Sequence, residues 1–258
     1  MNFSILVITK NEEVHLERFF DVAKAMSDDI VLVDSFSNDR TKEIARQYTS
    51  KIFNRAFDTH ANQLNFALDS IPFKYKFVLR LDADEYCDPV LIDQLAKLKL
   101  EPSIKAYAIN RKFIFMDKVL QFGGMSRYYC IRLFDRSACR FDNRIMDERI
   151  LIDNSYVKHI KGTIFDHNRN GLENYVIKHL WYAKREAESW KSQHTANHAA
   201  SMYYRFPAFT RAVLYFFYRY FFRFGFLDGR AGLFFHIIQG LLYRLMVDKY
   251  IKDENQIK

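Results

Sequence analysis

Short apolar runs alternate with amphipathic helical segments over residues 3–82, and this alternation limits the possible folds more than any other feature of the chain. Four apolar, β-type runs predict strands, at residues 3–9, 30–34, 51–53 and 77–82. Three helical patterns lie between them, at residues 11–23, 41–48 and 60–68. Strands that alternate with helices pair into a parallel sheet with helices on both faces. We therefore predict an α/β fold with a doubly wound, mostly parallel sheet.

The fourth apolar run ends in three carboxylates, Asp82, Asp84 and Glu85. Open α/β sheets bind ligands at the carboxyl ends of their strands, so these side chains stand where a ligand would bind. Two carboxylates separated by one residue suit a hard divalent cation, Mg²⁺ or Mn²⁺, which shares its coordination shell with substrate phosphates. The simpler interpretation is an acidic turn before a helix, because short motifs produce false positives.

Two other predicted strands end in polar residues that belong to the same edge of the sheet. Thr9 and Asn11 close the first strand, and Asp34 closes the second. We expect Asn11 to cap the following helix with its side chain, and Glu12 to lie in the first turn. The fingerprints GxGxxG and GxxxxGK[ST] are absent from this region, which disfavours the ordinary dinucleotide-binding and P-loop modes.

The charge of the chain favours an anionic partner. Its 258 residues include 39 basic and 31 acidic residues, for a net charge of +8, which suits nucleic acid, an acidic membrane surface or phosphorylated substrates. The three cysteines, Cys87, Cys130 and Cys139, form no CxxC pair, which is typical of a reducing cytosol. The first residues resemble a strand rather than a signal peptide, since no basic region precedes the apolar run.

Aromatic and arginine residues dominate the chain after a soft domain boundary that we place near residue 195. Residues 202–226 contain 13 aromatic residues, and a second amphipathic pattern covers residues 232–247. Five aromatic residues recur at helical spacing and predict an apolar face: Phe216, Phe217, Tyr220, Phe221 and Phe224. Arg211, Arg219 and Arg223 are expected at its cationic edges.

This segment has two interpretations. It either packs onto the rest of the protein or lies in the interface of an anionic membrane, with arginines on lipid phosphates. No run of 18 uncharged apolar residues occurs, so we expect no membrane span. The excess of aromatic residues favours the membrane interpretation.

Seven motifs occur in a recognisable order and spacing. They are Ile-Thr-Lys-Asn-Glu-Glu (8–13), Val-Asp-Ser-Phe-Ser-Asn-Asp-Arg-Thr (33–41), Leu-Asp-Ala-Asp-Glu (81–85), Met-Asp-Glu-Arg-Ile (146–150), Asp-His-Asn (166–168), Lys-His-Leu-Trp-Tyr-Ala-Lys-Arg-Glu-Ala (178–187) and Gly-Phe-Leu-Asp-Gly-Arg-Ala-Gly-Leu (225–233). Together they resemble glycosyltransferase family 2, and within it the bacterial branch that builds lipopolysaccharide core and exopolysaccharide. The resemblance implies a Rossmann-like GT-A fold, an inverting mechanism, a nucleotide-diphosphate-sugar donor and a divalent metal, Mg²⁺ or Mn²⁺.

The resemblance also implies roles for residues of this chain. Four residues would hold the nucleoside by their position in the motifs: Thr9, Asn11, Glu12 and Asp34. Asp84 would contact the metal, while Asp82 would lie near the ribose or a metal-bound water. His167 is expected to supply a further metal or phosphate contact. Arg132 would serve the donor phosphates or pair with carboxylates inside the site, and Glu85 would support the site.

An inverting transfer needs a base beside the acceptor hydroxyl, on the face opposite the leaving group. The candidates are Asp147 and Glu148. Relatives with His-Glu at this place favour Glu148, whereas relatives with Met-Asp-Glu, as here, leave Asp147 open. One of the two is expected to pair with Arg144 or Arg149 instead.

We therefore predict a glycosyltransferase on the cytoplasmic face of the cell membrane. Residues 1–195 would be catalytic, with the nucleotide-sugar site in about 1–100 and the acceptor part in about 101–195, and residues 196–258 would form a helical membrane-associating segment. A UDP-sugar would be the donor and a lipid-linked or lipopolysaccharide glycan the acceptor, with no nucleic-acid partner. The alternatives are a basic RNA-binding protein and a sugar-nucleotide nucleotidyltransferase, although the Gly-rich phosphate loop of that class is absent.

Overall fold

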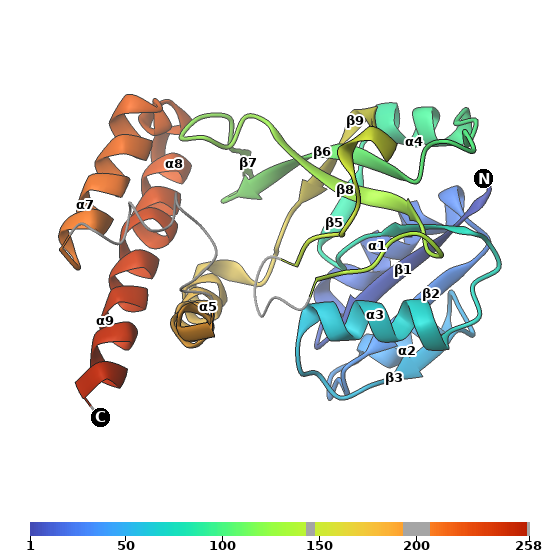
Figure 1. The fold of residues 1–258 in the computed structure, drawn as a ribbon, viewed down its shortest axis with the longest axis horizontal. Coiled ribbons are helices and arrows are strands. Elements are labelled where there is room, and N and C mark those ends of the chain that lie inside the picture. The colour runs from blue at the N-terminus through green and yellow to red at the C-terminus, as the bar shows by residue number, and fades with distance from the viewer. Residues whose placement is uncertain (143–147, 193–206, 257–258) are drawn as a thin grey trace. The chain divides into compact units, whose positions relative to one another are not determined.

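The computed structural model describes residues 1–142, 148–192 and 207–256 (Figure 1). These residues form two compact units. The first contains Met1–Phe113 and Arg127–Arg169, and the second contains Ile114–Ser126 and the described part of Asn170–Lys258. The predicted division near residue 195 concerns the roles of two parts of the chain, and it stays a prediction.

Half of the sheet in the first unit is parallel. Its strands are, in spatial order, β3 (Ile52–Asn54), β2 (Ile30–Asp34), β1 (Phe3–Thr9) and β4 (Phe77–Arg80). The sheet continues from β4 through β8 (Tyr128–Asp135), β6 (Ala106–Phe115), β9 (Val157–Asp166) and β5 (Glu85–Cys87). In this second half β6 and β9 are parallel and the other neighbours are antiparallel.

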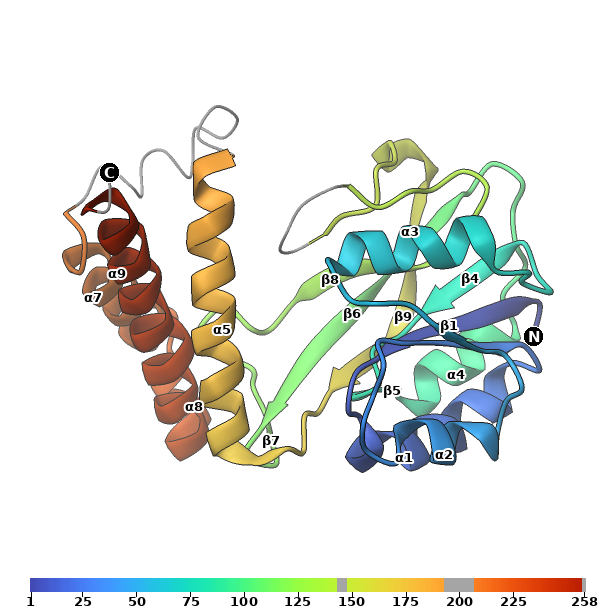
Figure 2. The same ribbon diagram turned by 90° about the horizontal axis from the view of Figure 1, so that it is seen from below.

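Helices cover both faces of this sheet (Figure 2). One face packs against α1 (Glu13–Met26), α2 (Thr41–Arg46) and α4 (Pro89–Ala96), and the other against α3 (His60–Ser70). A 3₁₀ turn, η1 (Asn154–Tyr156), precedes β9. Leu16, Phe19 and Phe20 of α1 are buried, because the helical repeat turns them toward the sheet. The predicted α/β class is confirmed: helices cover both faces of a mixed sheet whose first half is parallel, and further helices follow toward the C-terminus.

The expected role of Asn11 as a helix cap is wrong. Glu12 occupies the N-cap position of α1, and its side chain makes no capping hydrogen bond. Asn11 instead adopts a left-handed backbone with φ 56°, a conformation that asparagine tolerates better than most residues. Its N–H donates to Ser37 Oγ at 2.9 Å, and its Oδ1 accepts from the Asn38 N–H at 3.0 Å. A contact between two distant turns therefore replaces the local cap.

A β-bulge lies where β8 pairs with β6. Tyr107 is opposite Leu133, but the next residue, Ala108, is opposite Ile131, so Arg132 has no partner in the register. Bulges of this kind redirect a side chain and occur near functional sites. The bulge explains why the Arg132 side chain does not follow the regular alternation of side chains between the two faces of the sheet.

The second unit is mainly helical. It contains the end of β6 with β7 (Lys118–Val119), followed by α5 (Gly171–Ser192), α7 (Thr210–Phe217), the π-helical turn η2 (Tyr218–Phe222), the 3₁₀ turn η3 (Gly225–Asp228), α8 (Gly229–Phe235), the π-helical segment η4 (His236–Leu242) and α9 (Tyr243–Gln256). Ala183 and Ala187 of α5 pack against Val247 and Ile251 of α9. No helix within the described ranges is both long enough and apolar enough to cross a bilayer.

Polar contacts attach residues 120–125 to the C-terminal helices of this unit. The buried Asp228 carboxylate accepts the N–H groups of Gln121 and Phe122, at 2.9–3.1 Å. Arg219 Nε donates to the Gly123 carbonyl at 2.7 Å. A Cβ at Gly123 would lie 2.1 Å from Nε2 of His236, so a side chain there would collide with the buried ring. Burial, together with the charge of Arg219, lowers the pKa of His236 to about 4, which keeps this ring neutral near pH 7.

The expected cationic edges of the aromatic segment are only partly correct. Arg211 and Arg219 are buried, and Arg211 pairs with Asp248. Arg223 is exposed, as expected. The prediction failed for two of the three arginines because the helices are not isolated. Their neighbours in the unit supply buried acceptors, and a buried guanidinium is stable only with such partners.

Candidate active site

The carboxyl ends of β1 and β2 bring two predicted nucleoside residues together. Thr9 is opposite Asp34 in the parallel register, and its hydroxyl donates to Asp34 Oδ1 at 3.1 Å. The fully buried Asp34 carboxylate also accepts from the N–H and hydroxyl of Ser37, at 2.8 and 2.5 Å. These bonds join the β1–α1 turn to the β2–α2 turn.

The other two predicted nucleoside residues lie in the β1–α1 turn. Asn11 is exposed and Glu12 is half-buried. The Glu12 N–H donates to Thr41 Oγ1 at 2.8 Å, and its carboxylate lies 2.7 Å from His15 Nδ1. The structure therefore brings all four predicted residues to one edge of the sheet. His15, which the sequence reasoning missed, supports this turn from a fully buried position.

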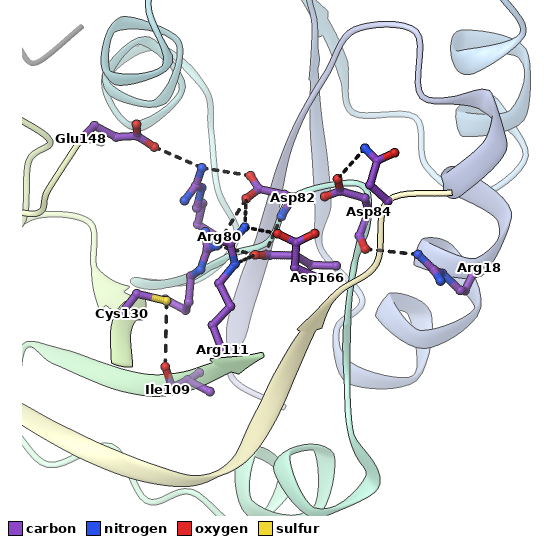
Figure 3. Close-up of polar contacts among 12 residues, drawn as sticks. Arg18, Arg80, Asp82, Asp84, Ile109, Arg111, Cys130, Glu148 and Asp166 are labelled. Atoms are coloured by element: carbon purple, nitrogen blue, oxygen red, sulfur yellow. Dashed lines mark hydrogen bonds and ion pairs between the residues drawn. The ribbon is translucent and has the colours of Figure 1, made fainter. Parts of the chain in front are cut away.

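Asp82 follows β4 and faces three guanidinium groups (Figure 3). Its carboxylate lies 2.9 Å from Arg80, 3.3 Å from Arg132 and 3.8 Å from Arg111. Burial alone would raise the pKa of Asp82, but the charges of Arg80, Arg132 and Arg111 outweigh it and hold the pKa far below its usual range. Asp82 is therefore ionised at any physiological pH, and much of its charge is already neutralised.

Glu85 is the charge partner of two of these arginines. Its side chain is 0% exposed, and Oε1 lies 2.5 Å from Arg132 Nη2 and 2.6 Å from Arg111 Nε. Its Oε2 accepts the N–H of Asp82 at 3.0 Å, which closes the turn. Arg111 also pairs with Asp166 at 2.7 Å. Burial disfavours the charged form of Arg111, yet Glu85 and Asp166 raise its pKa above the usual value.

Only one of the two predicted base residues can be placed. Asp147 lies outside the described residues, as does Arg144. Glu148 is mostly buried, and its Oε1 accepts from Arg80 Nη2 at 3.1 Å. The same guanidinium contacts Asp82, so Arg80 bridges the proposed donor side and the proposed base (Figure 3). Glu148 thus pairs with Arg80 and not with Arg144 or Arg149. For Asp147 the expected pairing stays a prediction.

Asp84 and His167 form a second group beside this cluster. The Asp84 carboxylate accepts from Asn168 Nδ2 at 3.2 Å, and its carbonyl accepts from the His167 N–H at 3.0 Å. Arg18 of α1 holds both residues, with Nη2 at 3.1 Å from the Asp84 carbonyl and Nη1 at 3.0 Å from His167 Nδ1. A guanidinium can only donate, so His167 Nδ1 accepts and its Nε2 carries the proton when the ring is neutral.

Among the side chains at this edge, Asp84 is better suited than Asp82 to bind a divalent cation. Within the described ranges, no three His, Cys, Asp or Glu side chains converge as a metal site. Mg²⁺ needs only one or two protein carboxylates, because waters and substrate phosphates supply its other ligands. The half-buried Asp84 carboxylate, with an amide as its neighbour, can take this role. Asp82 is already neutralised by arginines, and the Nδ1 of His167 is occupied by Arg18.

Three functional candidates were not identified from the sequence: Arg18, Arg111 and Asp166. Arg111 stands in a strand pattern, between the buried Ile109 and the half-buried Phe113. A charged residue at an inward position of an apolar strand is expensive without a partner, so its presence was a usable signal. Arg18 gave no such signal, because charged residues are common on the outer side of an amphipathic helix.

The fold and this edge define an α/β protein with a ligand site at a switch point of its sheet, the class that binds nucleotides. The sequence matches the family described as Glycosyl transferase family 2 over residues 4–211. This match covers most of the chain, and the protein belongs to that family, so it is a glycosyltransferase.

Individual relatives are more distant. An uncharacterized glycosyltransferase of Rickettsia typhi is 26% identical over 203 residues, which cover 74% of this chain and 68% of the relative. The S. aureus protein TarS in complex with UDP-GlcNAc is 14% identical and has a TM-score of 0.47, with 100% of this chain and 93% of that chain covered. Glucosyl-3-phosphoglycerate synthase from Mycobacterium tuberculosis in complex with phosphoglyceric acid is 12% identical, with a TM-score of 0.49 over 76% and 81% of the two chains.

The charge cluster gives a prediction for stability. Glu85→Gln should lower the free energy of unfolding by about 3–5 kcal/mol, because it leaves buried guanidinium charge uncompensated. The matched control Asp166→Asn removes a carboxylate from a more exposed pair and should cost about 1 kcal/mol or less. Urea denaturation followed by circular dichroism measures both. Equal and small losses would show that Glu85 does not hold the arginines.

Proposed function

We propose that the protein transfers one sugar from a nucleotide-diphosphate sugar, with a UDP-sugar as the donor, to a hydroxyl of a lipid-linked glycan in bacterial surface polysaccharide synthesis. One observation carries this proposal. In a chain of glycosyltransferase family 2, the strand ends gather the nucleoside candidates, the Asp82 and Asp84 carboxylates and Glu148 at one sheet edge. The lipopolysaccharide or exopolysaccharide branch rests on the resemblance of the motifs.

The two turns after β1 and β2 would receive the nucleoside. Thr9 and Asp34 are buried and bonded to each other, so they would support this site from beneath. Asn11 and Glu12 retain accessible atoms and would contact the base or ribose directly. Asp82 would stand at the ribose, as the resemblance implies.

The reaction would be a single displacement with inversion. The acceptor oxygen forms a bond to C1 of the donor sugar while the bond from C1 to the diphosphate oxygen breaks. The hydroxyl proton passes to a base on the acceptor side, and Glu148 is assigned this role, with Asp147 as the alternative. Arg80 would keep Glu148 at a constant distance from the donor side, which favours a productive orientation.

Positive charge would stabilise the leaving diphosphate. Mg²⁺ or Mn²⁺ held by Asp84, with Asp82 nearby, would supply most of it by neutralising the charge that develops on the phosphate oxygens. Arg132 would contribute a permanent charge from a site that is only 2% exposed, where electrostatic interactions are stronger than in water. His167 would contribute through Nε2, because its Nδ1 contacts Arg18.

A donor screen tests the proposed reaction and its metal. Purified protein should release a nucleoside diphosphate from one sugar nucleotide in the presence of Mg²⁺ or Mn²⁺, and excess EDTA should stop the release. Asp84→Asn should remove turnover while the circular dichroism spectrum stays unchanged. Full activity in EDTA would exclude the metal, and release from no sugar nucleotide would exclude the transfer.

The base assignment gives a sharper prediction. Glu148→Gln should reduce transfer by roughly 10²–10⁴-fold, because a glutamine cannot take the proton, and donor affinity should remain unchanged. Asp147→Asn is the paired variant. If Asp147→Asn is inactive and Glu148→Gln is active, the base is Asp147. Activity in both variants would contradict the assignment of the base to this pair.

The helical segment of the second unit would place the enzyme on an anionic membrane. Many large apolar side chains of residues 213–227 are exposed, and Phe222 reaches 75%: Val213, Leu214, Phe217, Tyr218, Phe221, Phe222, Phe224, Phe226 and Leu227. Residues 207–247 contain one carboxylate, Asp228, and it is buried. The exposed charges there include Arg223 and Arg230. An apolar surface with cationic and no acidic exposed groups suits anionic lipid.

Liposome co-sedimentation tests this surface. Binding should rise with anionic lipid and weaken only partly in high salt, since each basic residue contributes about 1 kcal/mol and apolar burial is insensitive to salt. The double variant Leu214→Ser, Leu227→Ser should bind several-fold less. Leu151 of the first unit is 63% exposed, more than Leu214 and Leu227 at 51% each, so Leu151→Ser is the control and should bind normally. If the double variant binds like the wild type, the surface has another role.

A further inference from the structure

A pair of aromatic rings, one exposed and one half-buried, lies at the end of the charge cluster in the first unit. Tyr128 begins β8 and is 49% exposed, and its ring centroid is 6.3 Å from that of Phe113 on β6. The guanidinium of Arg111 lies 4.7 Å from the Phe113 centroid. Neither ring has a role in the donor site, the metal site or the base described above.

The pleat of the sheet places this pair on the same face as the reacting groups. Arg111 is opposite Tyr128 in the β6–β8 register, and Phe113 is opposite Asp166 in the β6–β9 register. Because side chains alternate between faces, Arg111 and Phe113 point the same way. Arg111 also contacts Glu85 and Asp166, and Figure 3 shows it beside Asp166. It therefore links the charge cluster to Phe113.

The neighbouring tyrosine provides an internal comparison. Tyr129 is 48% exposed, almost the same as Tyr128, but it points to the opposite face of β8. There it packs against His159, with 4.6 Å between ring centroids. The two adjacent residues therefore match in type and exposure and differ in which face of the sheet they occupy.

We infer that Tyr128 and Phe113 form a platform on which a sugar ring of the acceptor stacks. The face of an aromatic ring is negative, and the C–H bonds on one face of a pyranose carry small positive charges, so the two surfaces attract. Ligand sites combine such apolar surfaces with a few polar groups that orient the ligand. Here Arg111, whose guanidinium lies over the Phe113 ring, and its ion-pair partner Asp166 can bond to the hydroxyls of the same sugar.

This role rests on the proposed function, and it assigns the acceptor side to the β6–β8 end of the sheet edge. The turns after β1 and β2, which would hold the nucleoside, lie in the parallel half of the same sheet, on the far side of β4. A donor and an acceptor that enter from these two sides would meet at Arg80, the last residue of β4, and at Asp82, which follows it. Glu148, bonded to Arg80, is then next to the acceptor, as a base must be.

Binding of simple sugars tests the platform without any transfer reaction. The probes are methyl glycosides of glucose, galactose, mannose and N-acetylglucosamine, observed by saturation-transfer NMR with the full-length protein. At least one should bind with roughly millimolar affinity, and its ring C–H protons should receive most of the saturation. Tyr128→Ala should weaken this binding by about 3- to 10-fold. Tyr128→Phe, which keeps the ring, should retain it.

Tyr129→Ala is the matched control and should bind as the wild type does. If no glycoside binds the wild type, or if Tyr128→Ala and Tyr129→Ala have equal effects, the platform is wrong. Nucleoside-diphosphate release without acceptor separates this result from the proposed function. Release that is normal in Tyr128→Ala, with unchanged glycoside binding, would reject the platform and leave the transferase intact. Glycoside binding that depends on Tyr128, in a protein that cleaves no sugar nucleotide, would retain the platform and reject the proposed reaction.

Discussion

The Glu85 carboxylate forms ion pairs with Arg132 and Arg111, and its side chain is fully buried. Together with Glu85, three arginines and three further carboxylates form this cluster, and an isolated charge there would cost several kcal/mol. Each guanidinium is shared: Arg80 between Asp82 and Glu148, and Arg111 between Glu85 and Asp166. The sharing determines where the members of this cluster stand, because none of them can move without uncovering the charge of its neighbour.

The turns around this cluster follow from the same constraint. The N–H of Asp82 bonds to Glu85, so the acidic turn after β4 is closed by the residue that also neutralises Arg132. The bulge in β8 releases Arg132 from the regular alternation and lets its side chain reach these carboxylates. Arg18 joins α1 to His167, directly after β9, through two hydrogen bonds, and to the Asp84 carbonyl through a third. These hydrogen bonds restrain the side chains at the sheet edge, and transfer chemistry needs defined distances between its groups.

The second unit buries two of its arginines and leaves many of its aromatic side chains exposed. Arg211 is paired with Asp248, and Arg219 with the Gly123 carbonyl, so these cations are inside. Phenylalanines of η2 and η3 remain outside. An arrangement that buries charge and exposes apolar rings is unfavourable in water alone. It becomes favourable when another apolar phase covers the rings, which is why we propose a membrane for this surface and a sugar for the smaller aromatic pair of the first unit.

The sequence by itself determined the order of strands and helices, the presence of a ligand edge and the family. These depend on local periodicity and on residues within a few positions of each other, such as the run from Phe77 to Glu85. The tertiary structure decided which arginine meets which carboxylate. The sequence offered Arg144 or Arg149 as partners of the base candidates, whereas Glu148 pairs with Arg80, which is 68 residues away.

Asn11 and Arg219 show the same limit. Local rules predicted that Asn11 caps a helix and that Arg219 faces lipid. Instead, the Asn11 N–H donates to Ser37 Oγ, and Arg219 Nε donates to the Gly123 carbonyl. Such contacts cannot be read from spacing, because the chain brings the two partners together only when the sheet and the helices have formed. Periodicity reports which side of an element is buried, and the fold alone determines what lies against that side.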